Sequence, residues 1–194
     1  MLKGERIELG DCIQGAFSSG GAAGANGKLE QIEFYEEASA TGNTKTFTLT
    51  QENLNFYDAL VLNYNLLSTQ AFNLEILVDG KTAGYAFSVS EDAAGTFTNS
   101  TASSQSECVM MDSTLISTEL LRIMGQVLIM PAEQNEGDDL CNLLFSGGVK
   151  TAGNAWGCCT VEPFDSTSMG SLTIQTSTSS WQIHSSMNLM GRKK

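Results

Sequence analysis

Apolar and polar side chains alternate along several short runs of this 194-residue chain, and the alternation limits the folds that it can adopt. The clearest run covers 72–78, where Phe72, Leu74, Ile76 and Val78 are separated by Asn73, Glu75 and Leu77. Successive side chains of a strand point to opposite faces of a sheet, so a period of two residues predicts a half-buried strand. The same alternation predicts strands over 46–50, 60–64 and 85–89.

Turn-forming residues are expected to separate these strands. Asp79-Gly80 follows the clearest run and is a strong hairpin signal, which makes 85–89 the expected returning strand. The other stretches rich in Ser, Gly, Asn and Asp are 90–106, 132–139, 146–154 and 165–171. Each of them is expected to be a turn or a loop.

The middle and the end of the chain add further strand candidates. The segment 114–130 fits either a helical turn at 118–124 followed by a strand at 126–130, or one bent strand with a bulge at Gly125. We favour strands, because β-branched and Met residues cluster there without helix caps. Residues 140–145, 156–161 and 172–174 are also strand candidates. A last strand is expected to place Trp181, Ile183, Met187 and Leu189 on one face.

About ten short strands with such spacing predict an all-β fold, a two-sheet β-sandwich of jelly-roll type. We expect this sandwich to be one domain over 29–194. Residues 1–28 are expected to form an extended N-terminal arm, since 11–27 (DCIQGAFSSGGAAGANG) are mostly small residues that gain little by collapsing. Such an arm could clasp a neighbouring subunit or fray as an ordinary terminus.

Charge narrows the choice of partners. The formal net charge is −12, which disfavours nucleic acid and anionic membrane surfaces as partners. No secretory signal and no apolar run long enough to span a bilayer is visible, so we expect synthesis in a cytoplasm. The five cysteines are then expected to stay reduced, as small buried hydrophobes.

The chain offers no recognisable catalytic constellation. His184 is the only histidine and is expected on the polar face of the last strand, without an orienting partner. Cys158 and Cys159 are adjacent and lack the spacing of a redox or zinc motif. The glycine-rich stretch 20–27 is not followed by the Lys-Ser/Thr of a phosphate-binding loop. We therefore expect no catalytic residues and no enzyme activity.

Two weaker ligand sites remain as candidates. Trp156, Tyr57 and Phe97 are candidates for a platform that stacks on sugars, although core packing is the competing interpretation for each. Glu136, Asp138 and Asp139 are the best calcium candidates, because a hard cation requires several oxygen ligands. Their segment does not match the EF-hand spacing, and a solvated loop is the competing interpretation. No other cofactor is expected.

Residues 45–80 (KTFTLTQENLNFYDALVLNYNLLSTQAFNLEILVDG) combine Thr- and Asn-rich strands, few charges and a tight Asp-Gly turn. The ending 187–194 (MNLMGRKK) adds a final strand, a glycine and a basic tail. In these features the chain resembles the β-sandwich tail, fibre, baseplate and head-decoration proteins of tailed bacteriophages. The resemblance covers under a third of the chain and rests on no defined motif, so no functional residues are transferred.

The resemblance implies a non-catalytic virion structural protein, made in the host cytoplasm, that mediates assembly or adhesion to a host surface. Its partners would be other virion proteins and copies of itself, with a trimer as one candidate order. The alternative function is a carbohydrate-binding module of a secreted or cell-surface system. A glycan hydrolase that uses paired carboxylates is a remote alternative.

Overall fold

The computed structural model describes residues 28–39, 42–50, 57–113, 121–132, 140–149, 153–162, 170–177 and 180–193, and within them it contains strands and no helix. The strands are β1 (Leu29–Glu36), β2 (Thr44–Thr48), β3 (Tyr57–Ser68), β4 (Leu74–Val78), β5 (Tyr85–Ala93), β6 (Thr96–Gln105), β7 (Cys108–Met111), β8 (Leu121–Ala132), β9 (Leu140–Val149), β10 (Gly153–Val161), β11 (Ser171–Thr176) and β12 (Ser186–Lys193). The arm expected over 1–28 lies almost wholly outside the described residues and stays a prediction.

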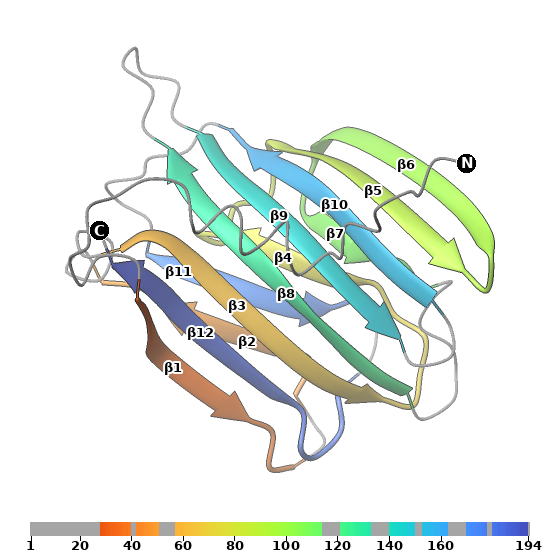
Figure 1. Cartoon of the computed structure of the whole chain (residues 1–194), viewed down its shortest axis with the longest axis horizontal. Helices are drawn as coiled ribbons and strands as arrows, with labels where there is room; N and C mark the ends of the chain where they lie inside the picture. The colour runs from red at the N-terminus through yellow and green to blue at the C-terminus, as the bar shows by residue number, and fades with distance from the viewer. Residues whose placement is uncertain are drawn as a thin grey trace, which may run out of the picture.

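The strands form two antiparallel sheets that face each other, which confirms the predicted two-sheet β-sandwich (Figure 1). The large sheet has eight strands in the order β1-β12-β3-β8-β9-β10-β5-β6. The small sheet has four strands in the order β2-β11-β4-β7 and lies behind the large sheet in the view of Figure 1. The chain changes sheet at each of the first four connections, so neighbours in sequence are rarely neighbours in a sheet.

The core lies between the sheets and is made by the side chains of alternate strand positions. Phe47, Leu74, Ile76 and Val78 of the small sheet are fully buried, as the alternation predicts. Facing positions of the large sheet are also apolar and buried; they include Leu60, Leu62, Leu66, Ile123, Val127, Ile129, Leu143 and Leu189. Burial of apolar surface at about 25 cal/mol per Å² is the main term that holds such layers together.

The Asp79-Gly80 turn forms, but the predicted hairpin does not. Both residues have positive φ, 54° and 62°, as a tight turn requires. The chain then crosses to the other sheet, where β5 begins at Tyr85. Val78 N–H donates to Tyr85 Oη at 2.8 Å and so links the two sheets there. The Asp79 carboxylate accepts N–H groups of Gly170 and Ser171 at the start of β11 instead.

Two stretches predicted as turns are strands. Within 90–106, β5 continues to Ala93, Ala94 and Gly95 make a two-residue turn at positive φ, and β6 follows. Within 146–154, β9 continues to Val149 and β10 begins at Gly153. Ser and Thr fit in β6 because both faces of that strand are exposed. Glycine fits in β9 because Gly147 lies against the large side chain of Tyr64. A composition rich in Ser, Thr and Gly is common to loops and to such strands, so it did not distinguish them.

The predictions for the middle and the end of the chain are resolved in part. Within 114–130 the described residues belong to one strand, β8, and Gly125 keeps the register with both neighbouring strands, so it is not a bulge. Trp181 is buried as predicted, but Ile183 is 43% exposed and lies in a turn. The last strand therefore begins at Ser186, later than the alternation predicted.

Gly125 and Gly147 are paired across β8 and β9, and together they make room for the buried ring of Tyr64. A Cβ atom at either glycine would overlap Tyr64 Oη. At Gly147 the next nearest atom is the Met124 carbonyl oxygen, 3.1 Å away. The tyrosine hydroxyl is therefore the main obstacle to a side chain at position 147.

We expect Gly147→Ala to lower the free energy of unfolding by about 1–3 kcal/mol, the usual cost of overpacking a core. Tyr64→Phe removes the hydroxyl, so the double variant should be more stable than the sum of the single effects predicts. Urea unfolding of the four proteins measures the coupling. Gly148→Ala is the control, because its Cβ would closely approach only the side-chain oxygen of Asn154, an exposed residue, and would make an ordinary contact with Gly153 O at 3.5 Å. Additive effects of Gly147→Ala and Tyr64→Phe would contradict this packing.

Candidate binding face

The outer face of the large sheet is broad and carries few charges. Strand alternation and register place these side chains outward along its five central strands: Ser186, Asn188, Met190, Arg192, Ala59, Val61, Asn63, Asn65, Leu67, Arg122, Met124, Gln126, Leu128, Met130, Asn142, Leu144, Ser146, Asn154, Trp156, Cys158 and Thr160. Two of them, Ala59 and Val61, are nevertheless buried. Only the two arginines are charged, and Arg192 makes a two-bond ion pair with Asp58.

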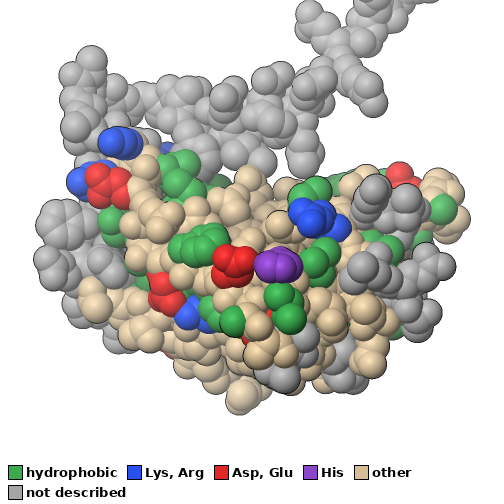
Figure 2. Space-filling model, turned by 90° about the horizontal axis from the view of Figure 1, so that it is seen from below, with side chains coloured by type: hydrophobic (Ala, Val, Ile, Leu, Met, Phe, Trp, Pro, Cys, Tyr) green, Lys and Arg blue, Asp and Glu red, His purple; other side chains and the backbone are tan. Residues whose placement is uncertain are grey.

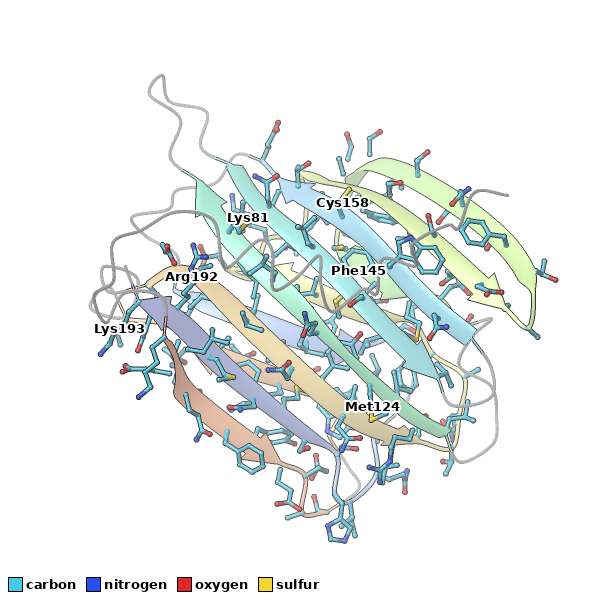
Figure 3. All side chains as sticks on the ribbon, viewed as in Figure 1. Lys81, Met124, Phe145, Cys158, Arg192 and Lys193 are labelled. Atoms are coloured by element: carbon cyan, nitrogen blue, oxygen red, sulfur yellow. The ribbon has the colours of Figure 1, made fainter. Side chains whose placement is uncertain are left out.

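Apolar side chains lie in the open on this face. Met124 on β8 is 51% exposed, and Leu144 on β9 is 45% exposed. Cys158 on β10 is also exposed and pairs in register with Leu144 (Figure 3). Exposed apolar groups that share one sheet face, with few charges among them, mark a surface suited to contact with another molecule.

Amide side chains run beside the apolar ones. Asn188, Asn63 and Gln126 occupy successive strands in register, and Asn63 Nδ2 lies 3.6 Å from Met190 Sδ. The Oδ1 atoms of Asn65 and Asn188 are buried and accept no hydrogen bond from the described residues. Buried acceptors without a donor are uncommon, and because these two have no accessible surface they are not open to an approaching partner.

The structure brings together two of the three predicted platform residues. Trp156 on β10 and Phe97 on β6 are 36% and 58% exposed, and their ring centroids lie 5.3 Å apart at a tilt of 55°. Ser90 of β5 lies between their strands and donates to Asn99 Oδ1 at 2.6 Å. The pair therefore offers exposed ring surface beside fixed polar groups.

Tyr57 does not join this pair. It begins β3, three strands away from β10 in the large sheet, and its ring packs on the backbone of Gly191 and against the core. Core packing, the competing interpretation, is correct for Tyr57. The predicted calcium ligands Glu136, Asp138 and Asp139 lie outside the described residues. In the described ranges no group of three or more His, Cys, Asp or Glu side chains is placed to hold a metal ion.

His184 lies in the turn before β12 and not in the strand that was predicted for it. Its φ is 67°, and its Nδ1 atom is 3.2 Å from Glu36 Oε1. Figure 2 shows this histidine, in purple, on the surface beside an acidic side chain. An exposed pair of this kind is weakly coupled and has no third group that would orient it for proton transfer within the described part of the chain.

Glu37 is a buried carboxylate that the sequence did not single out. Tyr35 Oη donates to its Oε2 at 2.6 Å and Trp181 Nε1 at 3.0 Å, while the N–H and hydroxyl of Ser39 each donate to Oε1 at 3.0 Å. These donors, with that of Tyr35 first, lower the pKa of Glu37 to about 2, against the opposing effect of burial. A carboxylate held ionised in this way anchors loops and is a poor proton donor.

The described cysteines are all free. Cys108, Cys141 and Cys159 are buried, as expected of small hydrophobes, whereas Cys158 is exposed on the outer face. Burial raises the pKa of Cys141 to about 12 and raises the pKa of Cys108 as well. The thiols of Cys108 and Cys141 are therefore protonated at neutral pH and unreactive.

Comparisons with known protein families, with curated proteins and with solved structures gave no match to this chain. In the part of the chain that the structure describes, no helix is long and apolar enough to cross a membrane.

We expect Glu37→Gln to lower the free energy of unfolding at pH 7 by about 3 kcal/mol, because it removes a buried charge that four donors stabilise. The folded pKa lies below the unfolded value, so this stability is present above about pH 4.5 and is lost as the pH falls toward 2. The difference in the free energy of unfolding between wild type and Glu37→Gln, measured with urea, should therefore decrease as the pH falls from about 4.5 toward 2. Glu36→Gln, at the exposed neighbouring residue, is the control. A difference in unfolding free energy that stays constant down to pH 3 would contradict the lowered pKa of Glu37.

Proposed function

We propose that this chain is a non-catalytic structural protein of a bacteriophage particle, and that it makes its contacts through the outer face of the large sheet. The observation that carries the proposal is this face itself, in which Met124, Leu144 and Trp156 are exposed in a chain of net charge −12. The described part of the five central strands contains one acidic residue, Asp58, which is paired with Arg192, and a low density of charge is expected where a partner must approach.

Strand order supports the same role. We infer that the sandwich is a jelly roll in which β1-β12-β3-β8 face β2-β11-β4-β7, an arrangement built from two Greek keys. The hairpins β5-β6 and β9-β10 are then insertions that widen one sheet. Jelly rolls recur in viral capsid and lectin domains, so the fold favours a shell or adhesion role by analogy.

Particles purified on a density gradient from cultures of the source should contain this chain when probed with an antibody against it. Recombinant protein should rebind to particles stripped of it. Leu144→Glu places a charge at the centre of the outer face and should weaken rebinding by about tenfold or more. Thr48→Glu, on the exposed face of the small sheet, should rebind normally. The role would be wrong if the chain never sedimented with particles.

Carbohydrate binding is the second candidate, and the Trp156–Phe97 pair favours it. Exposed rings flanked by Asn99 and Asn154 combine stacking with hydrogen-bonding groups, as sugar sites do. This site could serve host adhesion by a particle or act in a separate binding module.

A glycan array should then show binding that Trp156→Ala abolishes and Phe97→Ala weakens. Phe34→Ala is the matched control, since Phe34 is an exposed ring on β1 at the opposite end of the same sheet. Repeating the array with a chelator tests whether calcium takes part. Equal signals from wild type and Trp156→Ala would remove this candidate.

A further inference from the structure

Strand β6 is the free edge of the large sheet. It is ten residues long, pairs only with β5 among the described strands, and has no buried residue. Even the side chains that alternate toward the small sheet, Thr96, Thr98 and Ser100, are exposed. The backbone groups on the outer side of β6 therefore face solvent rather than a described strand.

The other sheet edges carry features that discourage pairing. Strand β1 contains three glutamates, and each is in an ion pair, with Lys193, Lys45 and His184. In the small sheet, β2 has five residues with Lys45 at its second position, and β7 has only four residues. Charges and short length are the common ways in which proteins protect edge strands.

Strand β6 has none of this protection. Its sequence, TFTNSTASSQ, contains no charged residue and no proline. A long uncharged edge is a template for another strand. A second copy would meet no like charge along this edge, although each copy carries a net charge of −12.

The energetics of β6 point the same way. Strand β6 is held in the described fold by one ladder, to β5, and by the contact of Phe97 with Trp156, while neither of its faces is buried. Pairing along the free side would give β6 a second ladder and complete its backbone hydrogen bonds.

We propose that β6 pairs antiparallel with β6 of a second copy about a two-fold axis at Asn99. The regular part of the strand runs from Thr96, after the Ala94-Gly95 turn, to Ala102. Beyond Ala102 the register shifts and Ser104 has a φ of 56°, so pairing ends there. Asn99 is the midpoint of this segment. An isologous antiparallel contact of this kind closes on itself as a dimer.

The register has a definite consequence for side chains. Residues opposite each other in an antiparallel pair share a face, so Phe97 would lie beside Thr101 of the partner subunit. The two large sheets would become one continuous sheet, and a Trp156–Phe97 pair would lie on each side of the axis. The proposal deepens the assembly role and rests on the expectation that the protein is a homo-oligomer.

The first test is the oligomeric state by sedimentation across a range of concentrations. Wild type should dimerise, and Asn99→Lys, which places two lysines opposite each other at the axis, should weaken dimerisation by about tenfold or more. Gln31→Lys on the β1 edge is the matched control and should behave as wild type. A monomeric wild type, or an Asn99→Lys protein that dimerises normally, would overturn the proposal.

The second test fixes the register. In a background with Cys12→Ser and Cys158→Ser, the substitution Asn99→Cys should give a disulfide-linked dimer on mild oxidation with oxidised glutathione. Two thiols are oxidised, two glutathione thiols are released, and reduction reverses the link. Gln31→Cys should stay monomeric on a non-reducing gel. Dimers in solution that never cross-link through position 99 would refute this pairing. That result would not affect the proposed particle role, which is tested separately by whether the chain sediments with particles.

Discussion

A sheet of four strands covers the inner face of a sheet of eight, and the rest of the molecule depends on this difference in width. Strand β7 extends the cover by lying against β5, β9 and β10. The buried side chains of those strands, such as Val89, Ala155 and Phe145, are apolar as a result. The cover does not reach β6, where the inward positions are Thr and Ser. The limit of the core therefore coincides with the strand that is richest in hydroxyl groups.

Much of the fold could be predicted because burial of one face imposes a period of two. The runs 60–64 and 72–78 show it clearly: the first lies in β3, the second contains β4 from Leu74 onward, and their apolar residues are in the core. The pairing of the strands was not predicted correctly. Asp79-Gly80 is a hairpin signal only if the next strand stays in the same sheet, and the change of sheet before Tyr85 is not visible in the local sequence.

The strand β6 was missed for a related reason. Ser, Thr and Asn are common both in loops and in strands exposed on both faces, so 96–105 has no apolar alternation to distinguish the two. The only local sign was Ala94-Gly95 between two runs of similar length, which is a two-residue hairpin turn. Gly147 in β9 misled in the same way, because the space that it leaves is filled by Tyr64 on another strand.

Part of the candidate site could likewise be predicted from the sequence, and part depends on contacts between distant residues. Trp156 and Phe97 could be chosen from the sequence because large rings among small residues are conspicuous, but their contact depends on the register of β10, β5 and β6. Tyr57 looked equivalent, and only its packing on Gly191, far away in the chain, shows otherwise. Glu37 gave no signal beyond an acidic pair, since one of its donors, Trp181, lies 144 residues away, and the local donors Tyr35 and Ser39 form no recognisable motif with it.

The three interior cysteines bear on the chemical durability of the protein. Cys108, Cys141 and Cys159 belong to β7, β9 and β10, so they are enclosed by both layers of the sandwich. An oxidant can reach them only when the layers separate, so burial protects these thiols in the folded protein. If the protein passes from a reducing compartment to an oxidising one, these three thiols should stay reduced as long as it remains folded. Oxidation of any of them would indicate that the protein had unfolded at some earlier time.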